Sequence, residues 1–572
     1  MTPSSILSVG IAVLAIAGSA SAQEPDEKRV TRLLPAQLDW PNAPAIRVPY
    51  PPFLQLSRAA LESDFDDPSG PMFVREDYVS IELDALVEVL DHRFEIFDRD
   101  GEIGGSGDLI AVTGPESMVD DVSRSLAVLQ DLVRPSIDVR VELWTVGDDL
   151  DQAVLPTVLS PAEFQGLQLR GNLLWSSATT TGFSQLMRFS ALESKPFVHD
   201  HEVEVAKEAR AGDPRVRSLI CGASARIEIE PAVAGDGLVL FGDVSFSRGE
   251  LGDRFYSLGL DEVGVLDAPR LRSSRATVSA RIENGGAMAI WSLGRSGHSP
   301  NFVMTVTANR PAVPSLDGLQ VVPISSLRSG RLTEIAVSRP SSERRFVGEF
   351  DFGEEQESVT WAATEATLES FYSGLDEEAW MVDAGGFLFV EDQSPLPGRF
   401  RQLEADLHRN VQVDFVTLAD ARGSFGGQDQ APASIWDRLV VPCLSSRVSI
   451  VSRGTEATEV FDYDVEIAED SKAMNPNVQG VFSGFIGTVR LMPEFGGRVR
   501  ASIIVDLMEA GEPRRQPVGG KDSGDLWLHD VVQAPCLWAG RLDLPRTIET
   551  GDAFDFQRDG ARTRLRSRVT FR

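Results

Sequence analysis

Two periods of apolar residues recur along the chain, one typical of helices and one typical of strands. Segments 82–90 and 115–132 place apolar residues three or four positions apart, which predicts amphipathic helices. Segments 138–143 and 499–508 alternate apolar and polar residues, which predicts strands with one face of each kind. In the first half, the pattern predicts a strand at 78–83, a helix at 82–90, strands at 94–98 and 108–114, a helix at 115–132 and a strand at 138–143.

The second half repeats this order. Turn signals fall at Asp100-Gly101 in the first half and at Gly385-Gly386 in the second. The predicted fold class is therefore α+β, with two small β-α-β-β-α modules, each followed by an antiparallel β-rich region. The predicted elements of the second half are a strand at 358–363, a helix at 364–375, two strands within 377–392, a helix at 399–407 and a strand at 410–418.

A repeat at residue level supports this duplication. The stretch HDHEVEVAKEARAGDPRVRSLICGASARIEIEP at 199–231 aligns without a gap to FDYDVEIAEDSKAMNPNVQGVFSGFIGTVRLMP at 461–493, at a constant offset of 262 positions. Looser matches continue downstream at an offset of 266. We expect two strands of the repeat to be assembly edges because they alternate and recur. The shared landmarks are Pro214, Gly222 and Pro231 with Pro476, Gly484 and Pro493, and the candidate assembly strands are Val203, Glu204 and Val205 with Val465, Glu466 and Ile467.

The N-terminus has the pattern of a secretory signal peptide. An apolar run at 6–17 precedes an A-x-A site that ends at Ala22, although no Lys or Arg comes before the run. We therefore expect an exported protein, in the periplasm or outer membrane. The expected divisions are a signal peptide at 1–22, a Pro-rich segment at 23–74, a first α/β module at 75–146, a first β region at 147–310, a linker at 311–355, a second α/β module at 356–418 and a second β region at 419–572.

Charge and cysteine content narrow the partners and the chemistry. A net charge of −32 disfavours nucleic acid as a partner and is typical of a solvated acidic surface. Three cysteines are too few for a disulfide framework in 572 residues. Cys443 and Cys536 both lie in the second half, so a bond between them is one alternative and free thiols are the other. Cys221 is expected to be a small buried residue.

Catalytic and metal-binding patterns are weak. His199 and His201 lie two positions apart, as in half of a metal site, but Phe461 and Tyr463 replace them in the second copy, which favours surface or packing roles. The stretch FDRDGE at 97–102 lacks the spacing of a calcium loop and favours a hairpin turn. The sequence contains no G-x-S-x-G, phosphate-loop or H-E-x-x-H motif. We expect neither an enzyme nor a cofactor or metal.

The duplicated unit resembles the secretins, the outer-membrane ring proteins of secretion systems and type IV pili. SGDLIAVTGPESMVDDVSRSLAVLQDLVRPSIDVRVELWTV resembles a ring-building module that runs into the secretin core. DPRVRSLICGASARIEIEPAVAGDGLVL and ATVSARIENGGAMAI resemble the core pattern D-P-x-V, G, P and D-G-x-V and its following strand. The resemblance covers most of 75–295 and again 358–555. It implies a component of a type II or type III secretion system, or of a pilus system, that self-associates and binds other envelope proteins.

Two departures from the secretin pattern leave a second interpretation open. No "V-P-x-L-x-x-I-P-x-L-G" gate signature follows Gly286 or Gly551, and secretins usually carry one core rather than two. The alternative is a periplasmic scaffold or binding protein that forms no pore. Membrane contact is expected through β-strands only. Transmembrane strands need about 9–11 alternating residues, and only the segment 499–508 approaches that length. A soluble arrangement is therefore favoured.

Overall fold

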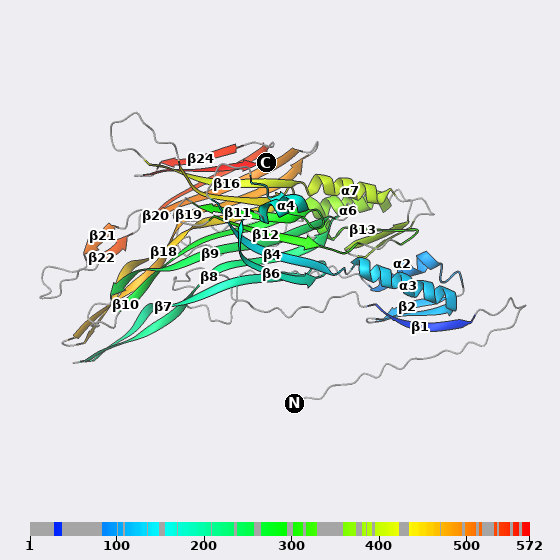
Figure 1. Ribbon diagram of the computed structural model, residues 1–572, viewed down its shortest axis with the longest axis horizontal. Coiled ribbons are helices and arrows are strands. Elements are labelled where there is room, and N and C mark those ends of the chain that lie inside the picture. Colours follow the sequence, from blue (N-terminus) through cyan, green and yellow to red (C-terminus); the bar gives the residue numbers. More distant parts are fainter. Residues whose placement is uncertain are drawn as a thin grey trace, which may run out of the picture.

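The computed structural model describes residues 28–36 and most of 83–328 and 359–571, and it is dominated by β-sheet (Figure 1). Within the two longer ranges, the residues outside the description are 100, 107–108, 134, 148–154, 169, 207–208, 234–236, 257–264, 295–300, 313–315, 373–379, 385, 392–394, 422–433, 469–470, 495–497, 511–513, 518–530, 535–536, 549–552 and 560–562.

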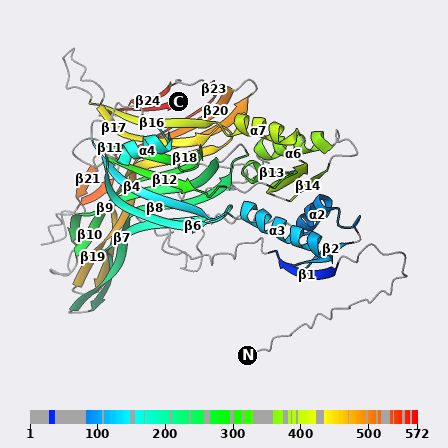
Figure 2. The same cartoon turned by 45° about the vertical axis from the view of Figure 1, so that its right-hand side comes forward.

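Two large antiparallel sheets pack face to face, and two small α/β modules lie beside one end of them (Figures 1 and 2). Phe246 of one sheet stacks on Phe302 of the other at 6.4 Å between ring centroids, and Phe415 stacks on Phe485 at 5.9 Å. The strand predicted at 138–143 alternates as the sequence predicts: Ile137, Val139 and Val141 are buried in the main apolar core, and Asp138 and Arg140 are exposed. This core continues from the sheets into the first module.

The first large sheet has eight strands in the order β23-β20-β19-β18-β10-β9-β8-β7. It is built from two consecutive meanders, one from each half of the chain, which meet where β10 pairs with β18. The strands are β7 (Met187–Ala206), β8 (Ala209–Pro231), β9 (Leu238–Tyr256), β10 (Val265–Ile282), β18 (Val448–Ala468), β19 (Ser471–Glu494), β20 (Arg498–Ala510) and β23 (Leu537–Ile548).

The second large sheet has nine strands in the order β24-β25-β16-β17-β11-β12-β4-β6, with the short β5 also paired to β11. Here too each half contributes a block of four neighbouring strands, and the blocks meet where β11 pairs with β17. The strands are β4 (Ile137–Val146), β5 (Val158–Leu159), β6 (Asn172–Thr181), β11 (Ala287–Gly294), β12 (Asn301–Asn309), β16 (Asn410–Ala421), β17 (Ser434–Leu444), β24 (Ala553–Asp559) and β25 (Thr563–Phe571).

The two α/β modules share one topology. Each has a three-stranded antiparallel sheet, ordered β1-β3-β2 in the first and β13-β15-β14 in the second. His92 of the first module stacks on Trp380 of the second at 5.3 Å. The first module comprises β1 (Arg29–Pro35), α2 (Leu83–Phe94), β2 (Glu102–Ser106), β3 (Leu109–Pro115) and α3 (Glu116–Val133). The second comprises β13 (Leu319–Pro323), α5 (Ser325–Arg328), α6 (Val359–Tyr372), β14 (Met381–Asp383), β15 (Phe387–Glu391) and α7 (Leu396–Leu407). Helix α4 (Pro161–Gln168) and the pair β21 (Arg514–Pro517) and β22 (Val531–Ala534) lie outside both modules.

Two of the predicted strands are wrong. Residues 94–98 end helix α2 and form a turn, with Glu95 at φ 47° and the Gly101 N–H donating to Ile96 O at 2.7 Å. The apolar Ile96 is buried by this turn instead of by a strand. Residues 359–363 belong to α6, because two alanines and the following helix-forming residues continue one helix. Asp100-Gly101 does not lie between two paired strands as predicted, because the strand that pairs with β3 is β2, which begins after it at Glu102.

Two expected connecting segments also contain strands. β1 lies within the Pro-rich 23–74 and β13 within the expected linker 311–355, and they supply the third strand of each module by pairing with β3 and β15. Most of the leading strand predicted at 78–83 lies outside the described residues. The helices α3 and α7 and the turn between β14 and β15 fall where the pattern predicts them.

Candidate assembly junction

The contact between the two halves is the best-defined candidate for a functional surface, because it joins two units edge to edge. In the eight-stranded sheet, Arg270–Ala276 of β10 pair with Val451–Ala457 of β18. In the nine-stranded sheet, Trp291–Gly294 of β11 pair with Asp437–Val440 of β17. One chain therefore contains an edge-to-edge contact of both sheets between its first and second halves.

Side chains extend the first of these ladders beyond its last backbone pair. The Ile450 N–H donates to Thr277 Oγ1 at 2.7 Å, and the Ser449 hydroxyl donates to Thr277 O at 2.9 Å. The Leu444 N–H donates to Ser279 Oγ at 2.9 Å. All of these groups are buried, so each bond also satisfies a polar group that would be costly to leave unpaired.

Arg453 links the two sheets across the junction. Its guanidinium donates from Nη1 to Ser274 Oγ on β10 at 3.1 Å and to the Ser292 hydroxyl on β11. The two serine oxygens are themselves 3.1 Å apart. All three residues are at most 4% exposed. A buried cation held by one hydroxyl from each sheet fixes the spacing of both sheets where the halves meet.

A buried ion pair supports the junction strand β17. Arg438 donates hydrogen bonds to both carboxylate oxygens of Asp414 on β16, at 3.0 Å and 2.6 Å, and both side chains are 4% exposed. Arg438 also faces Leu293 in the β11–β17 ladder. On the neighbouring strand, the Trp291 indole donates to Pro156 O at 2.8 Å.

Helix α7 docks on the sheets through a buried polar cluster. One carboxylate oxygen of Glu404 accepts from the Val233 N–H at 2.7 Å, and the other lies 3.5 Å from the Arg281 guanidinium. His408 lies one turn further along the helix and is 2% exposed. Burial lowers the pKa of His408 well below its usual value, and the charges of Arg447 and Arg281 lower it further. The cluster thus surrounds the imidazole of His408 at the C-terminal end of α7.

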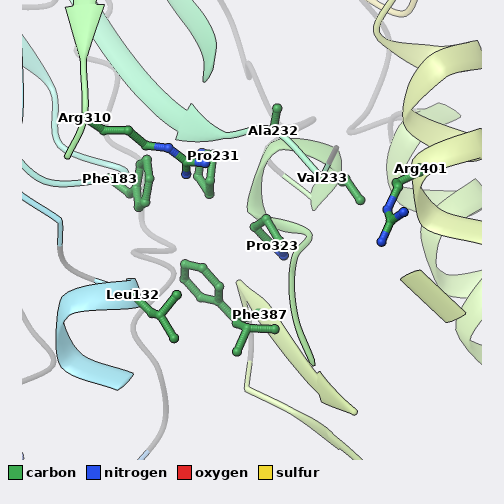
Figure 3. Close-up of a pocket in the computed structure, with 10 residues that line it drawn as sticks. Leu132, Phe183, Pro231, Ala232, Val233, Arg310, Pro323, Phe387 and Arg401 are labelled. Atoms are coloured by element: carbon green, nitrogen blue, oxygen red, sulfur yellow. The ribbon is translucent and has the colours of Figure 1, made fainter. Parts of the chain in front are cut away.

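A cavity of about 450 Å³ lies where the modules meet the sheets (Figure 3). Its lining is mostly apolar, with Phe183, Pro231 and Phe387 among the residues shown, and Arg310 and Arg401 are its charged members. Among the described residues, the lining contains no carboxylate, histidine, serine or cysteine.

The predicted assembly residues lie in the outer parts of two long hairpins. Val203, Glu204 and Val205 are in β7, which has β8 as its neighbour in the sheet order and forms the edge of the sheet. Val465, Glu466 and Ile467 are in β18 and pair with β19, beyond the part of β18 that pairs with β10. Strands β7 and β18 also contact each other away from their ladders, and partner binding by these residues stays a prediction.

The repeat landmarks occupy matching places in the two hairpins. A register shift falls between Val198 and Asp200 in the first hairpin and between Val460 and Asp462 in the second, just before the positions that face Pro214 and Pro476. Gly222 has φ 139°, and a Cβ there would lie 2.0 Å from Ala191 O. Its counterpart Gly484 faces Gly454, the matched position of Leu192. Pro231 ends β8, while Pro493 pairs with Val499 near the end of β19.

Comparison of the two copies missed the residues of the junction. Arg453 aligns with Ala191 and Arg438 with Ser176, so neither is shared between copies. Comparing the two copies finds residues that both units share. The junction uses a different edge of each unit, so its residues need not be shared. A usable signal was present: Arg453 interrupts a run of apolar and small residues at 448–455, on the same face of the strand as the buried Val451.

The remaining candidate chemistry is limited. Cys221 and Cys443 are free and buried, which confirms Cys221 as a small buried residue and leaves Cys443 unbonded, while Cys536 lies outside the described residues. Burial raises the pKa of the Cys443 thiol to about 12. Within the described ranges, no cluster of three or more metal-ligating side chains occurs. In the same ranges, no helix has the length and apolar character to cross a membrane.

Comparisons with known proteins return secretin structures. No protein-family model and no curated protein matches the chain. The secretin-domain β-barrel of InvG from the Salmonella SPI-1 injectisome is 10% identical, covers 38% of this chain and 75% of its own, and has a TM-score of 0.19. The Vibrio cholerae type IV competence pilus secretin PilQ is 11% identical, covers 37% of this chain and 69% of its own, and has a TM-score of 0.17. At these values the likeness concerns part of the fold alone and assigns neither a family nor a function.

Proposed function

We propose that this protein is a secretin-like component of a bacterial cell-envelope secretion or pilus system, built as a tandem duplication, that acts by self-assembly and by binding other envelope proteins. The observation that supports it is the edge-to-edge contact of the two halves in both large sheets. A unit that pairs with its own copy along both sheets already has the surfaces that a repeating assembly needs. The sequence resemblance to the secretin core points to the same class of protein.

Unpaired strand edges support the self-assembly part of the proposal. The two large sheets end in the strands β7 and β23 and in β6 and β24. Edge strands present rows of unsatisfied N–H and C=O groups, and soluble proteins cover, charge or shorten them. β7 has 20 residues and β23 has 12, so neither edge is short. Part of β7 is covered, because the strand contacts β10 and β19 and its Val198 N–H donates to Asp267 Oδ2 at 3.0 Å.

A non-pore periplasmic scaffold is the second candidate, and one observation favours it. The segment after Gly286, where a secretin gate signature would follow, forms the hairpin β11–β12. All eight residues of β11 are buried, and the strand lies between β12 and the junction strand β17. The described residues that follow Gly286 are therefore part of the core.

The two candidates differ in what the purified mature protein does. The test is negative-stain electron microscopy together with sedimentation velocity, on protein taken gently from its envelope with and without detergent. Rings with a central channel that need detergent would favour the secretin-like component. Assemblies of the same unit that form without detergent and lack a channel would favour the scaffold. Single chains at every concentration would contradict both.

A further inference from the structure

The free edges of the large sheets are the counterparts of the strands that already pair inside the chain. At the offset of 262 positions, edge strand β7 corresponds to β18, and at 266 positions edge strand β23 corresponds to β10. The internal junction is β10 with β18, so β23 of one molecule and β7 of another would repeat it. In the nine-stranded sheet, edge strands β24 and β6 correspond in the same way to β11 and β17.

In both sheets, an edge strand of the first half would meet an edge strand of the second half of another copy. The edges β6 and β7 both come from the first half, and β23 and β24 both come from the second half. They lie on opposite sides of the molecule, with β6 and β7 below and β23 and β24 above in Figure 2. A second copy can therefore engage both sheets at once, as the second half engages the first within the chain.

The internal register fixes which residues would meet. The pair Ala276 and Val451 corresponds to Leu542 and Phe189, both apolar. One step further, the bond from the Ile450 N–H to Thr277 corresponds to Asp543 facing Arg188. Arg188 is exposed in the single molecule. The register thus places an acid across from a base in place of a buried threonine hydroxyl.

A second exchange involves the residue that links the sheets. Within the chain, Arg453 of β18 meets Ser292 of β11. Between chains, the corresponding positions are Ala191 of β7 and Arg558 of β24. The arginine changes strands and the small residue takes its place, so each junction has one arginine and one small residue.

We propose that the β6–β7 side of one molecule pairs with the β23–β24 side of a second copy, in the register of the internal junction. This rests on the self-assembly part of the proposed function. The contact is heterologous, so it generates rings or filaments rather than twofold dimers. Two kinds of junction alternate along the assembly, one within each chain and one between chains, and a closed ring contains an even number of units.

Paired cysteines test the register. In a Cys536→Ser background, Leu192→Cys is combined with Ala539→Cys, whose counterparts Gly454 and Ser273 face each other inside the chain. Facing residues of antiparallel strands have Cα atoms about 4.5–5.5 Å apart, within the range that a disulfide spans. Ser273→Cys with Gly454→Cys is the matched positive control, and Leu192→Cys with Gly540→Cys is one position out of register.

The expected result on a non-reducing gel is a ladder of dimers, trimers and larger species for Leu192→Cys with Ala539→Cys. The positive control is expected to close a bond within one chain, and the shifted pair to stay uncrosslinked. Dimers from Leu192→Cys alone would overturn the inference, because they would show two identical edges meeting. Sedimentation of the same samples separates the two proposals. Assemblies without the ladder would overturn the edge assignment and leave self-assembly standing, and single chains would overturn both.

A charge exchange gives a second, independent readout. Arg188→Glu would place two carboxylates across from each other and weaken assembly roughly fivefold. Combining it with Asp543→Arg is expected to restore assembly. Arg124→Glu is the control, because it changes the net charge equally at a site away from both edges. Arg124 lies on α3, and its side chain is 76% exposed. Equal weakening by Arg188→Glu and Arg124→Glu, or no recovery in the combined variant, would overturn the proposed pairing.

Discussion

The buried pair of Asp414 and Arg438 gives the sharpest prediction for stability. Asp414→Asn removes the negative charge from a carboxylate that receives two hydrogen bonds, at 3.0 Å and 2.6 Å, from a guanidinium that is 4% exposed. Removing one partner of a buried ion pair costs about 3–5 kcal/mol, and asparagine keeps one acceptor, so the lower end applies. About 3 kcal/mol corresponds to roughly a hundredfold change in the unfolding equilibrium.

Urea unfolding followed by peptide-resolved hydrogen exchange measures this effect where it arises. We expect β16 and β17 to lose protection at lower urea in Asp414→Asn than in the parent protein. Asp121→Asn is the control, because Asp121 and Arg124 form an exposed pair on α3, and such pairs contribute about 0–1 kcal/mol. Equal shifts in the two variants would refute the reasoning that burial makes the Asp414 pair costly to break.

Three further predictions concern other sites. Gly222→Ala is expected to lower the thermal midpoint clearly, because the Cβ would lie 2.0 Å from Ala191 O at φ 139°, whereas Gly104→Ala, with open space around it, should change it little; equal midpoints would contradict this. The His408 contribution to stability should be full above pH 6.5, the usual pKa of an imidazole, and should decline as the pH falls below it towards the lowered pKa of His408. The reason is that the unfolded chain then binds a proton more readily than the folded chain. Thermal midpoints measured from pH 7.5 to 5 should therefore fall less in His408→Gln. The Cys443 thiol, whose pKa is raised to about 12, should resist iodoacetamide at pH 8 until urea unfolds the chain, and rapid labelling of the folded protein would argue against its burial.

The sequence predicted elements well where one period dominated. Helix α3 and strands β4 and β16 follow their apolar patterns, because each has a long stretch with a single buried face. The pattern failed at 94–98 and 359–363, where short apolar runs suit a turn or a helix as well as a strand and only the tertiary neighbours decide. The third strand of each module was missed because β1 and β13 lie in Pro-rich segments whose partners are distant in sequence.

The junction was the least predictable part. Its residues do not recur in the other copy, and their partners lie far away: Arg453 and Ser274 are 179 positions apart. A single sequence shows that an arginine interrupts a strand, but it does not show which hydroxyl accepts a hydrogen bond from it. The hairpin residues Val203–Val205 recur clearly, yet recurrence reports what a unit needs to fold as well as what it needs to bind.

The length of the central hairpins has a mechanical consequence. β19 has 24 residues, so at about 3.3 Å per residue it is roughly 80 Å long, and most of it is bonded to β18. Because the bonds of an antiparallel ladder lie across the strands, a pull along the hairpin shears many of them at once. A pull across the sheet opens them one after another and meets far less resistance. The molecule is therefore stiff along its strands and easier to peel at its edges.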